Sequence, residues 1–261
     1  MFVDTHTHLY CEEFDTDREE MLARARLAGA EALLLPNIDE VSLRPMLDMC
    51  EQNPGFCFPM LGLHPTELPD DPKPVLSRFQ SLLEDRKHPY VAVGEVGIDL
   101  YWDKSRLEEQ IEVFRIQTEW AVHYRLPLVV HTRSAHPEVV EVLRPYANRL
   151  CGGVFHCFGG SAEEAEELLS VFPNFYLGIG GVITFRKSSL PAVLKSRVPL
   201  CRLLLETDAP YLSPTPYRGK RNEPSYLPLV IAKLAEIYET SAEEVSQVTT
   251  ENALRLFRLN L

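Results

Sequence analysis

Short apolar runs alternate with longer amphipathic stretches along the whole chain. Residues 32–35, 128–130 and 203–205 are apolar at every position, which is typical of parallel strands buried on both faces. The pattern predicts eight strands, over residues 2–6, 32–36, 56–64, 91–98, 127–131, 153–156, 174–178 and 202–207. An amphipathic stretch follows each of them.

These amphipathic stretches predict helices over residues 17–28, 40–52, 72–86, 105–124, 136–147, 161–171 and 188–196, with a closing pair at 226–239 and 241–257. Eight strand–helix units in 261 residues are the size of a TIM barrel. We therefore expect an α/β fold, a single-domain (β/α)8 barrel over residues 1–261 with an extra C-terminal helix; a doubly wound open sheet is the alternative. The closing helices should wrap the barrel, and the Pro-rich stretch 210–225 should lie over its top.

Composition is ordinary for a globular domain, with 45% hydrophobic and 25% charged residues. The net charge of −12 argues against a broad basic surface for nucleic acid. No apolar run approaches the ~20 residues of a membrane span, and the chain is polar by Asp4, so we expect neither a membrane partner nor a secretory signal. The six cysteines form no C-x-x-C motif, which indicates free thiols in a cytoplasmic protein.

Histidines gather where the predicted strands end, which is where TIM barrels carry their chemistry. Five of the eight histidines and two carboxylates have this placement: His6, His8, His64, His131, His156, Glu95 and Asp208. Strand alternation would put His6 and His8 on one face, where they can share a metal. Imidazoles and carboxylates together suit divalent metals, and one carboxylate can bridge two cations about 3.5–4 Å apart.

Each of these residues alone also has a structural interpretation. His131 would serve as a core histidine, Glu95 as a buried ion-pair partner and Asp208 as a helix N-cap. The joint placement at strand ends favours a metal site. The remaining histidines, His88, His123 and His136, fall in a turn, late in a helix and at a helix start, so we assign them packing or solvent-exposed positions.

Seven short motifs carry these residues in a fixed order. They are Asp4-Thr5-His6-Thr7-His8, Gly62-Leu63-His64-Pro65, Gly94-Glu95-Val96-Gly97-Ile98-Asp99, His131-Thr132-Arg133, His156-Cys157-Phe158, Glu206-Thr207-Asp208-Ala209-Pro210-Tyr211-Leu212 and Lys220-Arg221-Asn222-Glu223-Pro224. In this order they resemble the TatD family of metal-dependent deoxyribonucleases, within the amidohydrolase-like barrels.

The resemblance implies a two-metal centre that hydrolyses phosphodiester bonds of DNA, as a 3'–5' exonuclease on single-stranded ends. Magnesium is the expected activating ion; zinc, manganese or nickel are ions that a structure can hold instead. By motif, the first metal would be held by His6, His8 and Asp208. His131 and His156 would hold the second, with Glu95 bridging both.

Further residues receive roles in this mechanism. Asp208 is the candidate general base and Glu95 the second catalytic residue. Arg133 is the candidate phosphate clamp, with a surface ion pair as the alternative. His64 would donate to a phosphate or to the leaving group, with a core role as the alternative, and Glu206 and Asp4 would orient metal ligands.

A basic run, Arg218, Lys220 and Arg221, is predicted near the barrel mouth, and Arg221 is taken as substrate-binding. Tyr101 and Trp102 follow the fourth strand, and an aromatic pair beside cations suits a single-stranded end whose bases stack; packing between loops is the alternative for Trp102. The expected partner is thus DNA, as strand ends or short single-stranded segments, with RNA as a second candidate. A monomer is favoured.

Two other functions compete with a nuclease. An amidohydrolase of a small cyclic amide or lactone would use the same metals, but many such enzymes carry a carbamylated lysine after strand four, where this chain has Glu95. A non-enzymatic binding role would not need intact ligands. The charge of −12 does not exclude a nuclease, because the substrate meets only the mouth, where two cations, Arg133 and the 218–221 run would face it.

Overall fold

Parallel strands and helices alternate throughout the computed structural model, which describes residues 1–85 and 87–260. In these ranges the strands are β1 (Phe2–Asp4), β2 (Ala30–Pro36), β3 (Cys57–Met60), β4 (Val93–Asp99), β5 (Leu128–Arg133), β6 (Gly153–Phe155), β7 (Phe175–Ile179) and β8 (Leu203–Leu205). All of the predicted strands are present, although several end earlier than the apolar pattern indicates.

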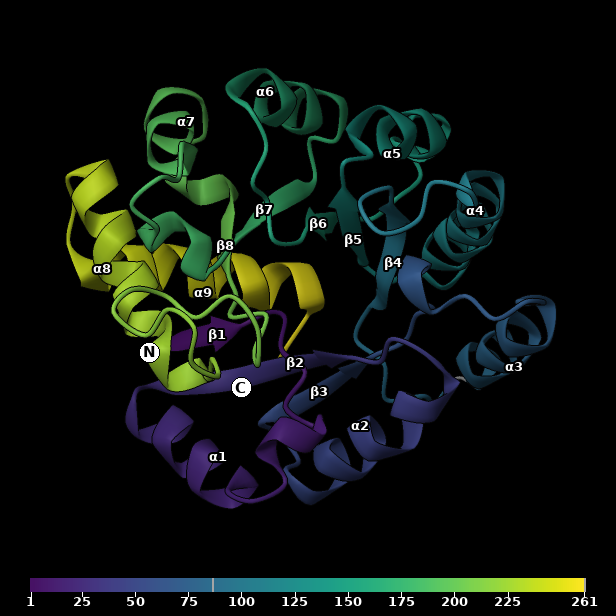
Figure 1. Cartoon of the computed structure of the whole chain (residues 1–261), viewed down its shortest axis with the longest axis horizontal. Coiled ribbons are helices and arrows are strands. Elements are labelled where there is room, and N and C mark those ends of the chain that lie inside the picture. Colours follow the sequence, from purple (N-terminus) through teal and green to yellow (C-terminus); the bar gives the residue numbers. More distant parts are fainter. Residues whose placement is uncertain (86, 261) are drawn as a thin grey trace.

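The strands follow one another around a ring in chain order (Figure 1). β1–β3 form one parallel sheet and β4–β8 form a second. A parallel bridge between Leu61 and Val93 joins β3 to β4. On the other side the Thr5 N–H, just after β1, donates to the Leu205 carbonyl of β8 at 2.9 Å. Sequential order around a ring confirms the TIM-barrel-like α/β fold, because a doubly wound sheet would reverse its strand order at a switch point.

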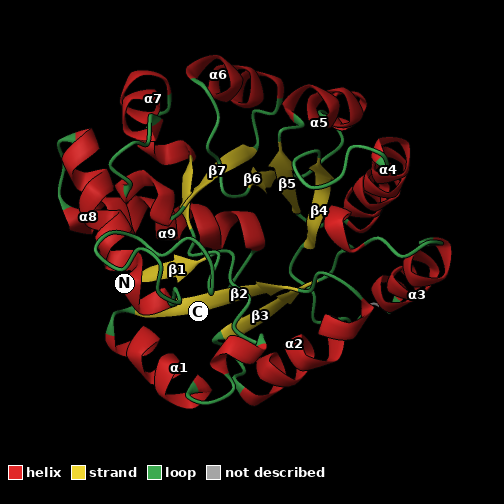
Figure 2. Ribbon diagram, viewed as in Figure 1, coloured by secondary structure: helices red, strands yellow, loops and turns green. Residues whose placement is uncertain are grey.

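The α-helices are α1 (Arg18–Leu27), α2 (Glu40–Gln52), α3 (Lys73–Glu84), α4 (Leu107–Tyr124), α5 (His136–Leu143), α6 (Ala162–Val171), α7 (Leu190–Arg197), α8 (Leu227–Tyr238) and α9 (Ala242–Phe257). All of them except α9 surround the ring (Figure 2). The capping boxes at Asp39 and Ser161 explain why α2 begins at the predicted residue and α6 within one residue of it. The predicted end of the third helix, at residue 86, lies outside the described residues. None of the described helices has both the length and the apolar character needed to cross a membrane.

Helix α9 does not wrap the barrel wall, so that prediction was wrong. Ala253, Leu256 and Phe257 of α9 pack in one cluster with alternate apolar residues from the strands, such as Val3 and Leu204. The neighbouring strand residues belong to a different cluster, which faces the outer helices. Alternation places the first set inside the ring. Helix α9 therefore covers the amino-terminal end of the barrel and leaves the carboxyl-terminal end open for a site.

Candidate active site

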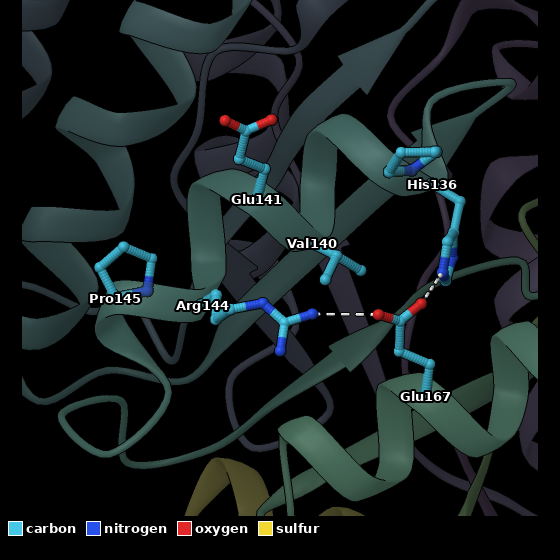
Figure 3. A pocket seen from close by; sticks show the side chains of 7 residues that line it. His136, Val140, Glu141, Arg144, Pro145 and Glu167 are labelled. Carbon is cyan, nitrogen blue, oxygen red and sulfur yellow. Dashed lines mark hydrogen bonds and ion pairs between the residues drawn. The ribbon is translucent and has the colours of Figure 1, made fainter.

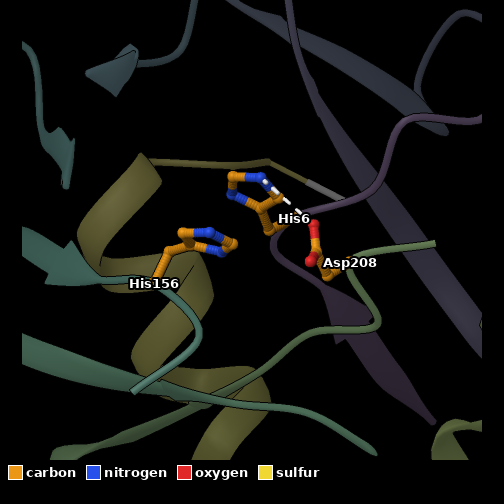
Figure 4. A group of neighbouring side chains, drawn as sticks. All are labelled: His6, His156 and Asp208. Carbon is orange, nitrogen blue, oxygen red and sulfur yellow. Dashed lines mark ion pairs between the residues drawn. The ribbon is translucent and has the colours of Figure 1, made fainter. Parts of the chain in front are cut away.

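The predicted ligands meet at the carboxyl-terminal end of the barrel. His6 and His8 lie after β1, Glu95 within β4, His131 within β5, His156 directly after β6, and Asp208 in the loop after β8. Figure 4 shows three of them facing one another. His6 and His8 come together as predicted, with their Nε2 atoms 3.2 Å apart, but strand alternation is not the reason, because β1 ends at Asp4. Backbone hydrogen bonds from Asp208 to His6 and from His8 to Ala209 position this loop instead.

Glu95 is the centre of the cluster, and one of its carboxylate oxygens faces the first group of donors. Its Oε2 lies 3.0 Å from His6 Nε2 and 3.7 Å from His8 Nε2. Asp208 completes this group, with Oδ1 at 3.5 Å from His8 Nε2 and 3.9 Å from His6 Nε2. Two imidazoles and two carboxylates thus surround one point.

The other oxygen of Glu95 faces a second group of donors. Its Oε1 lies 2.7 Å from His131 Nδ1, 2.9 Å from His156 Nε2 and 3.3 Å from His64 Nε2. One buried carboxylate therefore has a separate set of imidazoles at each oxygen. His64, predicted to contact substrate, also lies in this second group.

Outer carboxylates orient the histidines. Asp99 Oδ2 lies 3.0 Å from His131 Nε2. Glu206 Oε1 lies 3.4 Å from His156 Nδ1 and accepts the Cys157 backbone N–H. The motif containing Asp99 was recognised, but its contact with His131 was not predicted. The available signal was its spacing, because position 99 lies four residues after Glu95 on the same face of β4.

Two glycines make this crowding possible. Gly97 has φ of +154°, and a Cβ there would lie 1.9 Å from the His131 carbonyl oxygen, so β4 can approach β5 only with glycine. At Gly178 on β7, a Cβ would lie 2.2 Å from Glu206 Oε2. The Glu206 carboxylate thus occupies the space that a side chain at position 178 of β7 would fill.

Asp4 also has an orienting position, at the junction of β1 and β8. Its carboxylate accepts hydrogen bonds from the Thr207 hydroxyl at 2.6 Å and the Thr207 N–H at 3.0 Å. It also accepts the His6 N–H at 3.3 Å. Burial raises the pKa of Asp4 to about 7, against the opposing effect of these hydrogen bonds.

The electrostatics of the cluster favour a charged carboxylate among imidazoles. Burial alone would raise the pKa of Glu95, but His156 and His6 outweigh it and hold that pKa well below its usual value. Burial likewise works against protonation of His156, yet Glu95 and Glu206 raise its pKa well above the usual value. The pKa of Asp208 is lowered: burial opposes ionisation, but the hydrogen bond with His8 and the nearby imidazoles outweigh it.

The donor set fits divalent cations. Ligands to one such ion at about 2.0–2.2 Å lie at most about 4.4 Å apart, and the Asp208–His8 and Asp208–His6 pairs fall within this limit. Three overlapping trios have donor atoms within 4.8 Å of one another: His6, His156 and Asp208; His6, His8 and Glu95; His64, Glu95 and His131. Imidazole nitrogens and carboxylate oxygens that converge at a buried position are the donor chemistry of a divalent-cation site.

A cavity of about 1040 Å³ opens above the cluster, and aromatic side chains stand at its rim. Trp102 and Tyr211 line it and are 69% and 54% exposed. The Arg133 guanidinium, also in the lining, lies 3.9 Å from the ring centre of Tyr101 and 5.5 Å from that of Trp102. This is a cation held on an aromatic platform beside the cluster.

Arg221, which was predicted to bind substrate, is not part of the cavity lining. Both of its terminal nitrogens instead contact the Asp17 carboxylate, at 2.6 and 2.8 Å. The pair ties the loop after β8 to the start of α1.

The remaining histidines stay outside the donor cluster, as expected. His136 lies between the central cavity and a shallower depression of about 460 Å³ between α5 and α6. There the Glu167 carboxylate is shared by His136 and Arg144, at 3.0 Å each (Figure 3). Of the described polar side chains that line the depression, only Glu141 forms no ion pair, and a single carboxylate is not a binding site.

Comparison with known proteins gives one consistent family. The family described as "TatD related DNase" matches residues 3–258. A Bacillus subtilis protein named "Uncharacterized metal-dependent hydrolase YabD" is 41% identical over 260 residues, covering all of both chains. A "3'-5' ssDNA/RNA exonuclease TatD" from Pectobacterium atrosepticum is 33% identical, covering 98% of this chain and 99% of that protein. The crystal structure of the Escherichia coli TatD homologue YjjV, also 33% identical, superposes with a TM-score of 0.91 over 99% of this chain and 98% of its own.

Proposed function

This chain belongs to the TatD family of metal-dependent hydrolases, and from that membership and the geometry around Glu95 we propose that it is a two-metal nuclease. It would remove nucleotides from the 3' end of single-stranded DNA, with RNA as a second substrate. The single observation that carries the proposal is the Glu95 carboxylate, whose two oxygens face separate donor sets. A bridging carboxylate between two cations has this arrangement.

The first cation would be held by His6, His8 and Asp208, and the second by His131 and His156, with Glu95 shared. Bound divalent cations supply water of lowered pKa and offset charge on the phosphoryl oxygens. Magnesium is the proposed ion in function, and the same nitrogen-rich set accepts zinc, manganese or nickel.

Asp208 would act as the general base. Its carboxylate lines the cavity and has a lowered pKa, so it is ionised at neutral pH and can take a proton from the attacking water. Arg133 would hold a phosphate, because its guanidinium lines the cavity, carries no ion pair among the described residues and already rests on Tyr101. His64 Nε2 would donate to a phosphoryl or leaving oxygen from the second donor group.

The aromatic rim supports the proposed preference for single strands. Unpaired bases can stack on exposed Trp102 and Tyr211, whereas the bases of a duplex are already stacked on one another. We further propose one domain over residues 1–261; a monomeric state and a cytoplasmic location remain predictions.

The deciding experiment is cleavage of end-labelled single- and double-stranded DNA and RNA with magnesium, manganese or zinc. The expected result is stepwise shortening of single strands from the 3' end with magnesium. Inert nucleic acids together with hydrolysis of a dihydropyrimidine or lactone would overturn the proposal and favour the amidohydrolase alternative.

A further inference from the structure

Four cationic side chains gather on two neighbouring loops at the open end of the barrel. Arg186 and Lys187 belong to the loop between β7 and α7, and Arg218 and Lys220 to the loop between β8 and α8. All four are exposed. Arg186, Lys187 and Arg218 line a depression of about 460 Å³, which we call the basic depression.

Among the described residues these four cations have no carboxylate partner, and their position on two adjoining loops concentrates unpaired positive charge in one place. Over residues 1–85 and 87–260, none of the four forms an ion pair with a carboxylate, whereas neighbouring Arg221 is held by Asp17. A group of free cations on a chain of net charge −12 reverses the local sign of the surface potential.

The two loops are locked together, so the cations have a defined platform. The Arg218 guanidinium carbon lies 3.6 Å from the ring centre of Phe185. The Thr215 N–H donates to the Thr184 hydroxyl at 2.8 Å, and the Thr215 hydroxyl donates back to the Thr184 carbonyl at 3.2 Å. At Gly181 a Cβ would lie 2.1 Å from the Leu212 carbonyl oxygen, so the loops touch through backbone.

The basic depression also adjoins the central cavity. Leu212 lines the cavity and Thr215 lines the depression, and three residues of chain span at most about 11 Å. A single strand that leaves the central cavity past Leu212 therefore meets the basic depression next.

We propose that the basic depression is a second contact region for single-stranded nucleic acid, where Arg186, Lys187 and Arg218 bind phosphates several nucleotides away from the cleaved bond. The inference rests on the proposed nuclease function for its ligand. It explains how a chain of net charge −12 holds a polyanion: cations confined to one path beside the mouth do so without a basic surface elsewhere.

The test is binding of a labelled single strand of about 12 nucleotides, a length within known site sizes, to the full chain in EDTA at several salt concentrations. EDTA removes both hydrolysis and the metal contribution. The variant carries Arg186→Gln, Lys187→Gln and Arg218→Gln together. Three lost phosphate contacts should reduce the slope of log K against log salt by about 2 and weaken binding at least about tenfold.

A matched control removes three cations from the other end of the barrel. Arg149 precedes β6, and Arg255 and Arg258 lie in and just after α9, so Arg149→Gln, Arg255→Gln and Arg258→Gln change net charge equally away from the mouth. The control should keep the wild-type slope. Equal slopes in both triple variants would overturn the proposal. If the slopes of the wild-type chain and the depression variant differ as expected, but the wild-type chain cleaves no nucleic acid with any metal, the nuclease function is refuted and the contact region stands.

Discussion

The two ends of the barrel are built from the same eight strands and have opposite chemistry. At the amino-terminal end, Phe257 and Leu256 of α9 close the ring with apolar side chains. At the carboxyl-terminal end, His6, Glu95 and His156 are as deeply buried as those apolar residues, yet they are polar and crowded. One end excludes water for stability, and the other concentrates buried imidazoles and carboxylates that contact one another and are suited to ligate cations.

The difference shows how a barrel separates stability from chemistry. Apolar burial at the closed end stabilises the fold, so the open end can hold groups that are costly to bury. Substitutions at the two ends should therefore have separable effects, on unfolding at one end and on metal and substrate at the other.

The largest expected effect is at the open end, from Glu95→Ala. Removing the carboxylate that would bridge the two proposed cations should reduce bound metal to one equivalent or none and lower turnover by about 10²–10³-fold or more. Metal analysis and single-strand cleavage measure both. The control Glu108→Ala removes an exposed carboxylate from α4 and should change neither. Turnover retained by Glu95→Ala in added magnesium would disprove the bridging role.

At the closed end, Phe257→Ala tests the other half of the comparison. Phe257 is 3% exposed within the ring-filling cluster, so its truncation should lower the free energy of unfolding by about 3–5 kcal/mol. Turnover of the folded fraction should stay at the wild-type value.

Trp102→Ala is the matched truncation at the open end, since that ring is 69% exposed. It should leave the free energy of unfolding in urea almost unchanged and raise the KM for single strands. If both truncations destabilised the chain equally, the division between the two ends would be wrong.

The same division explains what could be predicted from the sequence. Continuous apolar runs such as residues 32–35 predicted the strands, because strands buried on both faces allow few polar residues. Helix α9 was misplaced because an amphipathic pattern shows that a helix buries one face, but not whether that face meets the wall or the end of the barrel.

At the site, the sequence predicted which residues converge, because strand ends of one barrel share a level. It could not predict the pairing of Arg221 with Asp17, which is 204 positions away. The spacing of Glu95 and Asp99 shows that the two share a face of β4, but only the register between β4 and β5, which pairs Gly97 with His131, brings Asp99 to His131.

A smaller effect is expected from the outer carboxylate Glu206. Glu206→Gln should weaken metal binding by about 10–100-fold, as for other groups that orient a metal-bound histidine. Gly178→Ala should mimic it, because the added Cβ enters the space of the Glu206 carboxylate. Calorimetric titration with manganese measures both. Gly159→Ala is the nearby control, because a Cβ there meets nothing closer than the Cys157 carbonyl oxygen at 3.9 Å. Unchanged affinity in Glu206→Gln would show that His156 needs no such support.

The smallest effect concerns the tether between the open end and α1. Hydrogen bonds from Arg221 and Arg24 hold the pKa of Asp17 well below its usual value of 3.8. Because the pKa of Asp17 is lower in the folded chain than in the unfolded chain, its charge stabilises the fold at pH values above the unfolded pKa. This contribution is lost as the pH falls from the unfolded pKa toward the folded pKa. Asp17→Asn should therefore cost about 1 kcal/mol at neutral pH, since the pair is partly exposed, and progressively less below about pH 4. Urea unfolding of the wild-type chain and the variant across this pH range measures the difference. The control Asp15→Asn removes a more exposed carboxylate, which pairs with Arg18, and its cost in unfolding free energy should be near zero. A difference that does not change with pH would show that packing of the loop, rather than charge, joins the open end of the barrel to α1.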